Sequence, residues 1–194
     1  VYDTVLYSNG HIAVSAVETN IVIWDIETRR ILQTLQGHTD LVTSVVLSPD
    51  ERLVVSGSDD ETVIVWDLDT RAALRTLRAH TDAVNSVVVS PDGKTIFSGS
   101  EDKTIVMWNL DTGEAIRTFQ GHTTGVTSLA ITPDGRRLIS GSRDGVLIAW
   151  RVDTLADLIK WTATNRYIHE FTCEERRSFN VVPLCEPIPA TPQS

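Results

Sequence analysis

The chain repeats itself every 42 residues, and this period constrains the fold more than any other feature of the sequence. Four tryptophans and three histidines keep this step: Trp24, Trp66, Trp108, Trp150, His38, His80 and His122. A constant period of this length is typical of architectures in which one supersecondary unit stacks on the next. We therefore expect a core that is built in slices, one for each repeat.

Each repeat has the composition of short β-strands. In residues 37–78, the runs 42–47, 53–58 and 63–66 are rich in Val and Ile, which pack well on a pleated surface. The tripeptide Ser48-Pro49-Asp50 separates the first two runs and predicts a tight turn, and a fourth run at 73–77 alternates like an edge strand. Each repeat is thus predicted to be a four-stranded antiparallel meander.

The period divides the chain into five predicted parts. They are a partial, eroded repeat at 1–36, three full repeats at 37–78, 79–120 and 121–161, and a C-terminal tail at 162–194 that contains a short helix and a proline-rich end. The first part aligns with the others, but Val14-Ser15-Ala16 replaces Ser56-Gly57-Ser58, and Glu18 replaces the loop aspartate.

The order Gly-His, Ser-Gly-Ser-x-Asp and Trp-Asp, with 28 residues from His38 to Trp66, resembles the WD-repeat family of β-propellers. The resemblance implies an all-β fold with four blades, each a four-stranded antiparallel sheet, arranged around a channel. Propellers of this family usually have about seven blades. We therefore expect this chain to be part of a larger propeller, completed by blades upstream or by another chain, with a closed four-bladed ring as the remaining possibility.

The resemblance also implies a hydrogen-bonded tetrad of His, Ser, Asp and Trp inside each complete blade. Carried over by position, the members are His38, Ser56, Asp60 and Trp66; His80, Ser98, Asp102 and Trp108; and His122, Ser140, Asp144 and Trp150. A Ser, a His and an Asp also form catalytic triads, but a nucleophile has no reason to occur once per repeat. We interpret the sets as structural networks and predict that the protein is not an enzyme.

Charge and composition restrict the partners. The net charge is −9, which repels the phosphate backbone of nucleic acids and anionic lipids. No apolar run approaches the roughly 18 residues that a membrane helix needs, and no signal peptide is visible, so a cytoplasmic protein is expected. No cofactor and no metal are predicted.

Several loop residues are candidates for binding a partner. In the family they fall on the narrower face of the propeller, and they are mostly acidic until the last repeat, where the sign changes: Asp40, Asp59, Glu61, Asp82, Glu101, Thr123 and Arg143. A solvated surface that keeps the protein soluble is the simpler interpretation. The functional one is a docking face for a basic or mixed peptide.

The tail leaves three alternatives open for its thiols. His169, Cys173 and Cys185 suggest a zinc site without an evident fourth ligand, a disulfide, or two unremarkable thiols. The tail is also similar to the closing segments of bacterial multidomain proteins.

Two classes of function follow. The first is a non-catalytic scaffold or sensor module of a multidomain, bacterial signalling-type protein that binds a protein or peptide on its loop face. The alternative is a propeller-based hydrolase or a regulatory subunit of an enzyme complex.

Overall fold

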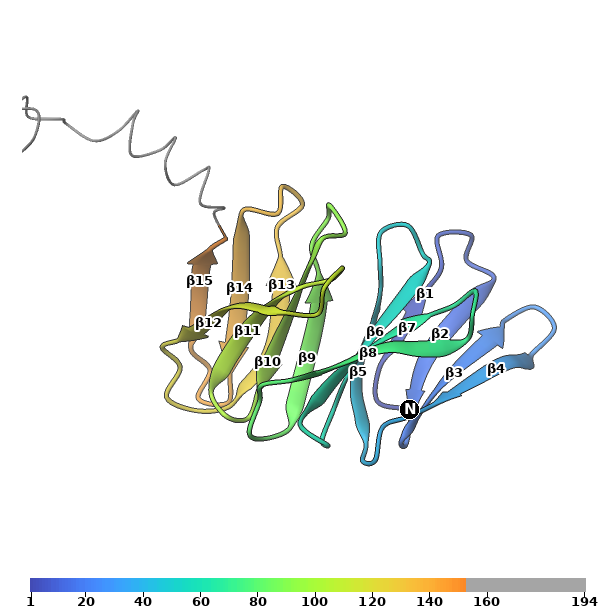
Figure 1. Cartoon of the computed structure of the whole chain (residues 1–194), viewed down its shortest axis with the longest axis horizontal. Coiled ribbons are helices and arrows are strands. Elements are labelled where there is room, and N and C mark those ends of the chain that lie inside the picture. Colours follow the sequence, from blue (N-terminus) through green and yellow to red (C-terminus); the bar gives the residue numbers. More distant parts are fainter. Residues whose placement is uncertain (153–194) are drawn as a thin grey trace, which may run out of the picture. The chain divides into compact units, whose positions relative to one another are not determined.

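Four β-sheets follow one another in the order of the sequence (Figure 1). A computed structural model of the chain describes residues 1–152, and it places strands where the Val- and Ile-rich runs predict them. No helix occurs among these residues. The helix predicted in the tail and the outer strand predicted near residues 157–161 lie outside the described residues.

The first two sheets are antiparallel meanders of four strands each. Their strands are β1 (Thr4–Leu6), β2 (Ile12–Val17), β3 (Asn20–Asp25) and β4 (Arg30–Gln36), then β5 (Val42–Leu47), β6 (Leu53–Ser58), β7 (Thr62–Asp67) and β8 (Ala72–Arg78).

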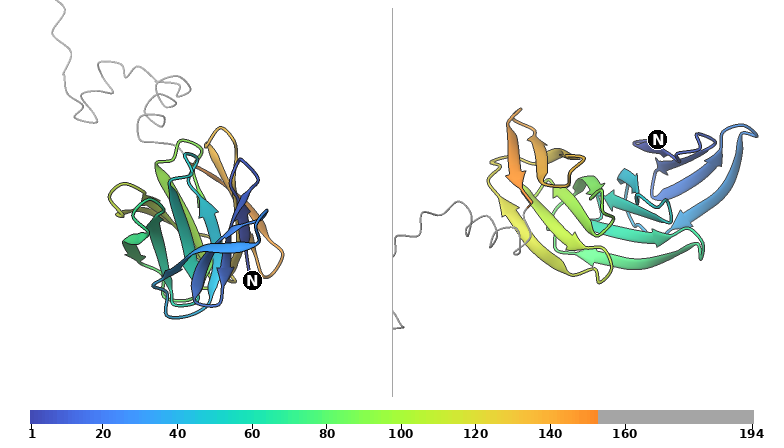
Figure 2. Two further views of the ribbon diagram at one scale, coloured as in Figure 1. Left: turned by 90° about the vertical axis from the view of Figure 1, so that its right-hand side faces the viewer. Right: turned by 90° about the horizontal axis from the view of Figure 1, so that it is seen from above.

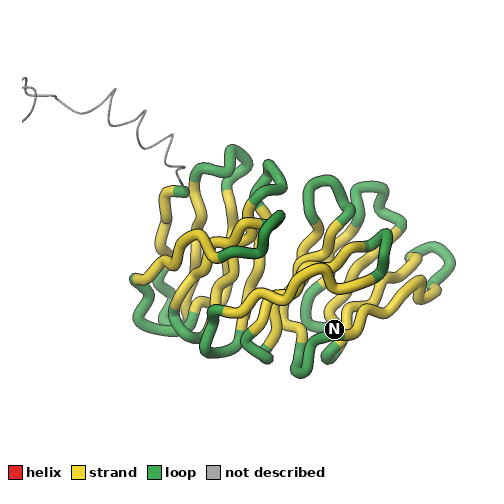
Figure 3. Tube along the Cα trace, in the orientation of Figure 1, coloured by secondary structure: helices red, strands yellow, loops and turns green. Residues whose placement is uncertain are grey.

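The third sheet repeats this meander, and the last has three strands within the described residues. Their strands are β9 (Val84–Val89), β10 (Thr95–Ser100), β11 (Thr104–Asn109) and β12 (Ala115–Gln120), then β13 (Val126–Ile131), β14 (Arg137–Ser142) and β15 (Leu147–Arg151). Figure 3 shows the same succession of strands joined by short loops.

Within residues 1–152, the sheets pack face to face along an arc (Figure 2). The first strand of each sheet lies on the inner side of this arc, and the fourth strand of each of the first three sheets lies on the outer side. We call the first strands, β1, β5, β9 and β13, the inner strands. The arrangement is that of propeller blades.

The core lies between the sheets. Val14 and Ile21 of the first sheet pack with Val54 and Trp66 of the second, and two similar clusters join the second sheet to the third and the third to the last. The middle strands β6 and β7 are buried almost throughout, because a sheet lies on each side of them. This explains why their apolar runs do not alternate with polar residues.

The turn between the first two strands of each repeat is held by its own side chains. The Ser90 hydroxyl lies 2.5 Å from the Asp92 carboxylate and accepts the Thr95 N–H at 2.9 Å. Gly93 adopts a positive φ of 69°, a left-handed conformation that glycine reaches without strain. In the second sheet Glu51 takes this conformation with φ of 57°.

Candidate functional site

The sheet β5–β8 contains a closed network around His38. Its Nδ1 lies 2.9 Å from Asp60 Oδ2, and its Nε2 lies 2.7 Å from Ser56 Oγ. Trp66 Nε1 donates to the same Ser56 oxygen at 2.8 Å, and the Thr62 hydroxyl donates to Asp60 Oδ1 at 2.6 Å. The structure thus brings together all four residues of the first predicted tetrad and adds Thr62 to them.

The network is arranged like a catalytic triad but is closed to substrates. A carboxylate can only accept hydrogen bonds, so the imidazole proton lies on Nδ1 of His38 and Nε2 accepts the Ser56 hydroxyl proton. Ser56 has no exposed surface, and the Trp66 indole covers it as a second hydrogen-bond partner. The hydroxyl has no route to a substrate, and the set connects the loop of His38 to the strands of its sheet.

The sheet β9–β12 repeats the network. His80 Nδ1 lies 2.8 Å from Asp102 Oδ2, and His80 Nε2 lies 2.7 Å from Ser98 Oγ. Trp108 Nε1 donates to Ser98 at 2.8 Å, and the Thr104 hydroxyl donates to Asp102 Oδ1 at 2.7 Å. Both Trp66 and Trp108 are 2% exposed, so the network sits inside the core.

The last sheet forms only part of the expected set. His122 Nε2 lies 2.6 Å from Ser140 Oγ, and Trp150 Nε1 donates to Ser140 at 2.8 Å. The expected bond between His122 and Asp144 is absent, and the buried Nδ1 of His122 has no hydrogen-bond partner within residues 1–152. The tetrad prediction is wrong on this point.

Val146 explains why Asp144 lies elsewhere. It stands where Thr62 and Thr104 stand in the complete networks, so no hydroxyl holds the carboxylate next to the imidazole. Asp144 instead accepts the Ser142 hydroxyl at 2.5 Å and the Thr123 hydroxyl at 2.9 Å. These two hydrogen bonds lower the pKa of Asp144 to about 2.

The carboxylates of the complete networks are held in their charged form. Burial alone raises the pKa of Asp60, but hydrogen bonds from Thr62, the Thr39 N–H and His38 outweigh it and lower the pKa. Asp102 behaves in the same way. Burial lowers the pKa of His38, although the nearby Asp60 opposes this. For His38 and Asp60, the favoured state is therefore a neutral imidazole beside a carboxylate.

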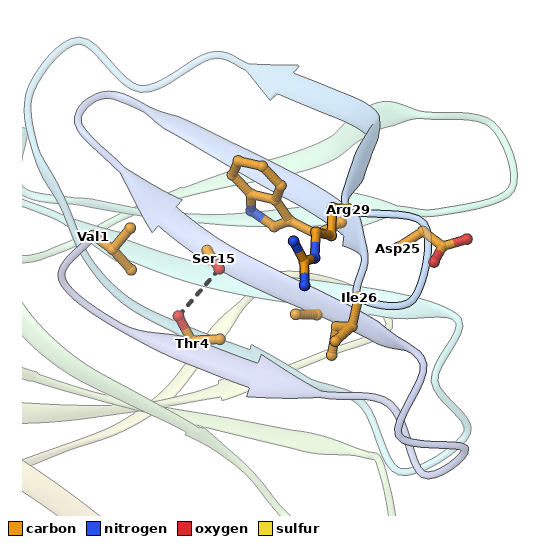
Figure 4. Close-up of a pocket in the computed structure, with 8 residues that line it drawn as sticks. Val1, Thr4, Ser15, Asp25, Ile26 and Arg29 are labelled. Carbon is orange, nitrogen blue, oxygen red and sulfur yellow. Dashed lines mark hydrogen bonds between the residues drawn. The ribbon is translucent and has the colours of Figure 1, made fainter.

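The first sheet lacks the network, as its sequence predicts. Val14 occupies the serine position and is fully buried, and the indole nitrogen of the half-buried Trp24 has no hydrogen-bond partner within residues 1–152. Trp24 instead lines a mostly apolar hollow of about 390 Å³ on the exposed face of this sheet (Figure 4).

The hollow carries no constellation for catalysis. Its other lining residues are Val1, Thr4, Ala13, Ser15, Asp25, Ile26 and Arg29. The Thr4 hydroxyl donates to the Ser15 hydroxyl at 3.1 Å, as the dashed line in Figure 4 shows. The Thr28 N–H binds the carboxylate of Asp25 and lowers its pKa, so this group is committed to a turn.

Three of the predicted partner-binding residues form an acidic cluster. Asp40 and Asp59 lie on adjoining loops of one repeat, because the Asp59 N–H donates to the Leu41 carbonyl oxygen at 2.9 Å. Partial burial raises the pKa of Asp59, and the neighbouring charges of Asp40, Asp60 and Asp82 raise it further. Asp82 belongs to the next repeat, so the cluster spans two sheets.

The other predicted residues have separate environments. Arg143 Nε donates to Glu101 Oε2 at 2.8 Å, and Asn85 Nδ2 donates to the same oxygen at 3.2 Å. Thr123 is bound to Asp144, and Glu61 is exposed at the tip of its turn with φ of 69°. The acidic cluster together with the Glu101–Arg143 ion pair is called the loop face below.

The comparison with protein families decides where the chain belongs. The family described as WD domain, G-beta repeat (WD40) matches residues 29–67, 71–109 and 113–151, which together make up more than half of the chain. The chain belongs to the WD40 repeat family. Each matched WD40 repeat begins near the fourth strand of one sheet and ends on the third strand of the next, so repeat and sheet are offset.

The similar proteins contain WD40-like stretches within much longer chains. Pre-mRNA-processing factor 19 of Mus musculus is 47% identical over 51 residues, which are 26% of this chain and 10% of that protein. Nuclear distribution protein PAC1 of Arthroderma otae is 45% identical over 56 residues, which are 28% of this chain and 12% of that protein. The matches thus span only about a tenth of these relatives, which are mammalian and fungal and give no support to a bacterial type.

Two further classes of site are absent from residues 1–152. No group of three or more His, Cys, Asp or Glu side chains is arranged to hold a metal ion there. No helix in this part of the chain is long and apolar enough to cross a membrane. The thiols of Cys173 and Cys185, with His169, lie outside the described residues.

Proposed function

We propose that this WD40 chain is a non-catalytic interaction module that binds a basic segment of a partner protein on its loop face. WD40 repeats imply a protein-interaction scaffold, and the buried serines support a structural role for the His, Ser and Asp sets. The observation that carries the proposal is the acidic cluster of Asp40, Asp59 and Asp82, in which partial burial and, after it, the neighbouring carboxylates raise the pKa of Asp59.

The charge of the loop face changes along the repeats. The first two full repeats contribute the acidic cluster, whereas Arg143 of the last repeat pairs with Glu101. A partner with positive side chains opposite the cluster relieves the repulsion among the carboxylates. Complementary charges of this kind act mainly on specificity and on the association rate.

The relatives support only a general conclusion. Their names place one in pre-mRNA processing and the other in nuclear distribution, and these roles are said of those proteins alone. That this chain serves as the sensor end of a multidomain signalling protein stays a prediction.

The test measures how the positive charge of a peptide and the negative charge of the loop face affect binding to the full chain. Twelve-residue peptides that differ only in their number of lysines are titrated against the protein by calorimetry. We expect affinity to rise with positive charge and to fall with added salt. Replacing Asp40, Asp59 and Asp82 by Asn keeps their shape and removes their charge, so the variant should lose most of the binding.

The control changes acidic residues at the opposite ends of the strands. Asp69 and Asp111 lie in the loops that follow β7 and β11. The double variant Asp69→Asn, Asp111→Asn should leave binding unchanged. Equal binding by the loop-face variant and the original chain would contradict the proposal. Turnover of a substrate that is lost in Ser56→Ala would favour the hydrolase alternative.

A further inference from the structure

The fourth strands of the first three sheets carry only positive charge, although the protein as a whole is acidic. Their charged residues are all arginines: Arg30 on β4, Arg75 and Arg78 on β8, and Arg117 on β12. None of the three strands contains an aspartate or a glutamate, whereas the chain has a net charge of −9. We call β4, β8 and β12 the outer strands, because they follow one another along the outer side of the arc (Figure 2).

The positive charge is highest on β8. Equivalent positions lie one repeat apart, so Gln33 and Gln36 of β4 correspond to Arg75 and Arg78 of β8. On β12, Arg117 corresponds to Arg75, and a glutamine again stands at the position of Arg78. These two positions therefore carry two charges on β8, one on β12 and none on β4.

The arginines of β8 have no carboxylate partner in the described part of the chain. Neither Arg75 nor Arg78 forms an ion pair there. The aspartates nearest in sequence are already bound, because the Asp67 carboxylate accepts a backbone N–H of its own turn at 2.7 Å and Asp69 lies 3.4 Å from Arg52. Both guanidinium groups can therefore bind a carboxylate of another molecule.

Packing holds the side chain of Arg75 in place. A Cβ atom on Gly113, in the turn before β12, would lie 2.9 Å from Arg75 Cδ, so the aliphatic part of Arg75 lies against this turn. On β12, the guanidinium carbon of Arg117 lies 4.3 Å from the centroid of the Phe119 ring. An arginine that is already ordered by packing loses less conformational freedom when it binds a carboxylate.

Each outer strand also exposes an aliphatic side chain. Leu32, Leu74 and Ile116 occupy equivalent positions of β4, β8 and β12 and are 50%, 44% and 55% exposed. By contrast, Leu77 of β8 is buried in the core between the second and third sheets. The strand β8 thus carries an exposed leucine directly before Arg75.

One edge of β8 has no strand beside it. β8 pairs with β7, and no described strand pairs with its other side. Such an edge offers backbone N–H and C=O groups to an additional strand. Opposite charges across a strand pair are stabilising, and like charges are destabilising. A second copy of β8 would place arginines against arginines, whereas an acidic strand would place carboxylates against them.

We propose that β8 binds an extended, acidic segment of a partner protein, which adds a strand to the free edge of β8. Backbone hydrogen bonds hold the segment, its carboxylates pair with Arg75 and Arg78, and an aliphatic side chain packs on Leu74. This surface differs from the loop face and has the opposite charge. The inference therefore does not rest on the proposed function.

The probe is a twelve-residue peptide with four glutamates among threonines and valines, and the target is the isotope-labelled full chain. We expect the amide signals of β8 to shift and to saturate with a Kd of roughly 0.1–1 mM, because a free strand loses conformational freedom on binding. Glutamine in place of every glutamate should weaken binding. A peptide with the same glutamates and with proline at alternate positions cannot pair with an edge and should cause no saturable shift.

Variants of the target test the role of the arginines. The double variant Arg75→Gln, Arg78→Gln makes these positions of β8 the same as those of β4. It should weaken binding roughly fivefold, as expected for the loss of two exposed ion pairs. The matched control is Arg136→Gln with Arg137→Gln, which removes two exposed arginines at the start of β14 and should leave binding unchanged.

A second pair of variants tests the aliphatic contact. Leu74→Asp should weaken binding more than the two arginine substitutions together, because it removes an apolar contact and adds a charge that repels the peptide. Ile116→Asp makes the same change at the equivalent position of β12 and should leave binding unchanged. Equal losses in the two variants would show that β8 is not the binding strand.

Four results would overturn the inference. The first two are the absence of saturable shifts at 2 mM peptide and unchanged binding in the Arg75→Gln, Arg78→Gln variant. The third is binding of an oligonucleotide or of phosphatidylserine vesicles through these arginines without binding of the peptide, which would make phosphate the ligand. The fourth is the same shifts when the chain is concentrated without peptide, which would make a second copy the occupant. The loop-face variant should still bind the acidic peptide.

Discussion

The sheets β9–β12 and β13–β15 carry the same four network residues but connect them differently. In β9–β12, His80 lies between Ser98 and Asp102, and Thr104 holds the second oxygen of Asp102. In β13–β15, Ser140 is the only hydrogen-bond partner of the His122 ring within residues 1–152.

The difference shows which residue places the carboxylate. Asp102 and Asp144 occupy the same position in their repeats, so the aspartate alone does not ensure a bond to the histidine. The threonine two residues later orients it, and Val146 cannot. Among the described residues, the buried Nδ1 of His122 is left without a hydrogen-bond partner, at a cost of about 1–3 kcal/mol.

The largest expected effect comes from the tryptophans. Trp108→Ala should lower the free energy of unfolding by about 3–5 kcal/mol, as for other buried aromatic truncations. Trp150→Ala should cost less, because Trp150 is only half-buried and its network is incomplete. Urea unfolding followed by circular dichroism measures both, and equal losses would contradict the comparison.

The next largest difference between the two sheets should come from replacing their aspartates. Asp102→Ala leaves the buried Nδ1 of His80 with only the Thr104 hydroxyl, at 3.4 Å, as a hydrogen-bond partner and should cost about 1–3 kcal/mol. Asp144→Ala takes no partner from His122 and should cost under about 1 kcal/mol, for the lost bonds to Thr123 and Ser142. The same unfolding measurement applies, and a larger loss for Asp144→Ala would show that the comparison is wrong.

Exchanging one hydroxyl should convert one network into the other. Thr104→Val removes the donor to Asp102 and should destabilise the protein by about 1 kcal/mol, whereas Val146→Thr should stabilise it by a similar amount. NMR of the histidine ring nitrogens provides the direct readout. In Val146→Thr, the proton of His122 should settle on Nδ1, and an unchanged ring spectrum would refute the role given to the threonine.

The smallest expected effect is the pH dependence of a complete network. Burial lowers the pKa of His38 below its ordinary 6.5. At a pH between the folded and the unfolded pKa, the unfolded chain therefore binds a proton at this ring that the folded chain does not bind. The stability from this group is fully present above pH 6.5 and is lost as the pH falls through the lowered folded pKa. The melting temperature should therefore decrease when the pH is lowered from 7.5 to 5.5.

The variant His38→Gln isolates this contribution. It should be less stable at every pH but should lose less on acidification, because the titrating ring is gone. The lowered pKa values of Asp60 and Asp102 act in the same direction, but only as the pH falls below their ordinary 3.8. A pH slope as steep in His38→Gln as in the original chain would contradict the assignment.

Much of the fold could be predicted because the same physical signal occurs in every repeat. The Val- and Ile-rich runs and the turn at Ser48-Pro49-Asp50 are local features, and the 42-residue period places them in register. The absent network of the first sheet was equally visible, because Val14 cannot replace the hydroxyl of Ser56.

The site was less predictable, because its geometry depends on residues outside the family pattern. The position shared by Thr62, Thr104 and Val146 changes chemistry in the last repeat, which is visible in the sequence. That this hydroxyl orients the carboxylate becomes clear only from the distances. Charge alone likewise predicted the acidic loops, but not that Glu101 pairs with Arg143.

The contact of Asp3 with β5 has a consequence for how such repeats diverge. Its carboxylate accepts the Val45 N–H of the second sheet at 2.9 Å. Between the later sheets, the hydroxyls of Ser44 and Ser86 accept the corresponding N–H groups of Val87 and Leu129. The contact between two neighbouring sheets thus requires an oxygen atom that accepts this N–H, and not a particular side chain. Because each repeat contacts only its neighbours, such an exchange needs compensation in one place alone. One copy of a duplicated gene segment can therefore diverge far in sequence from the other copies while its sheet still packs against theirs.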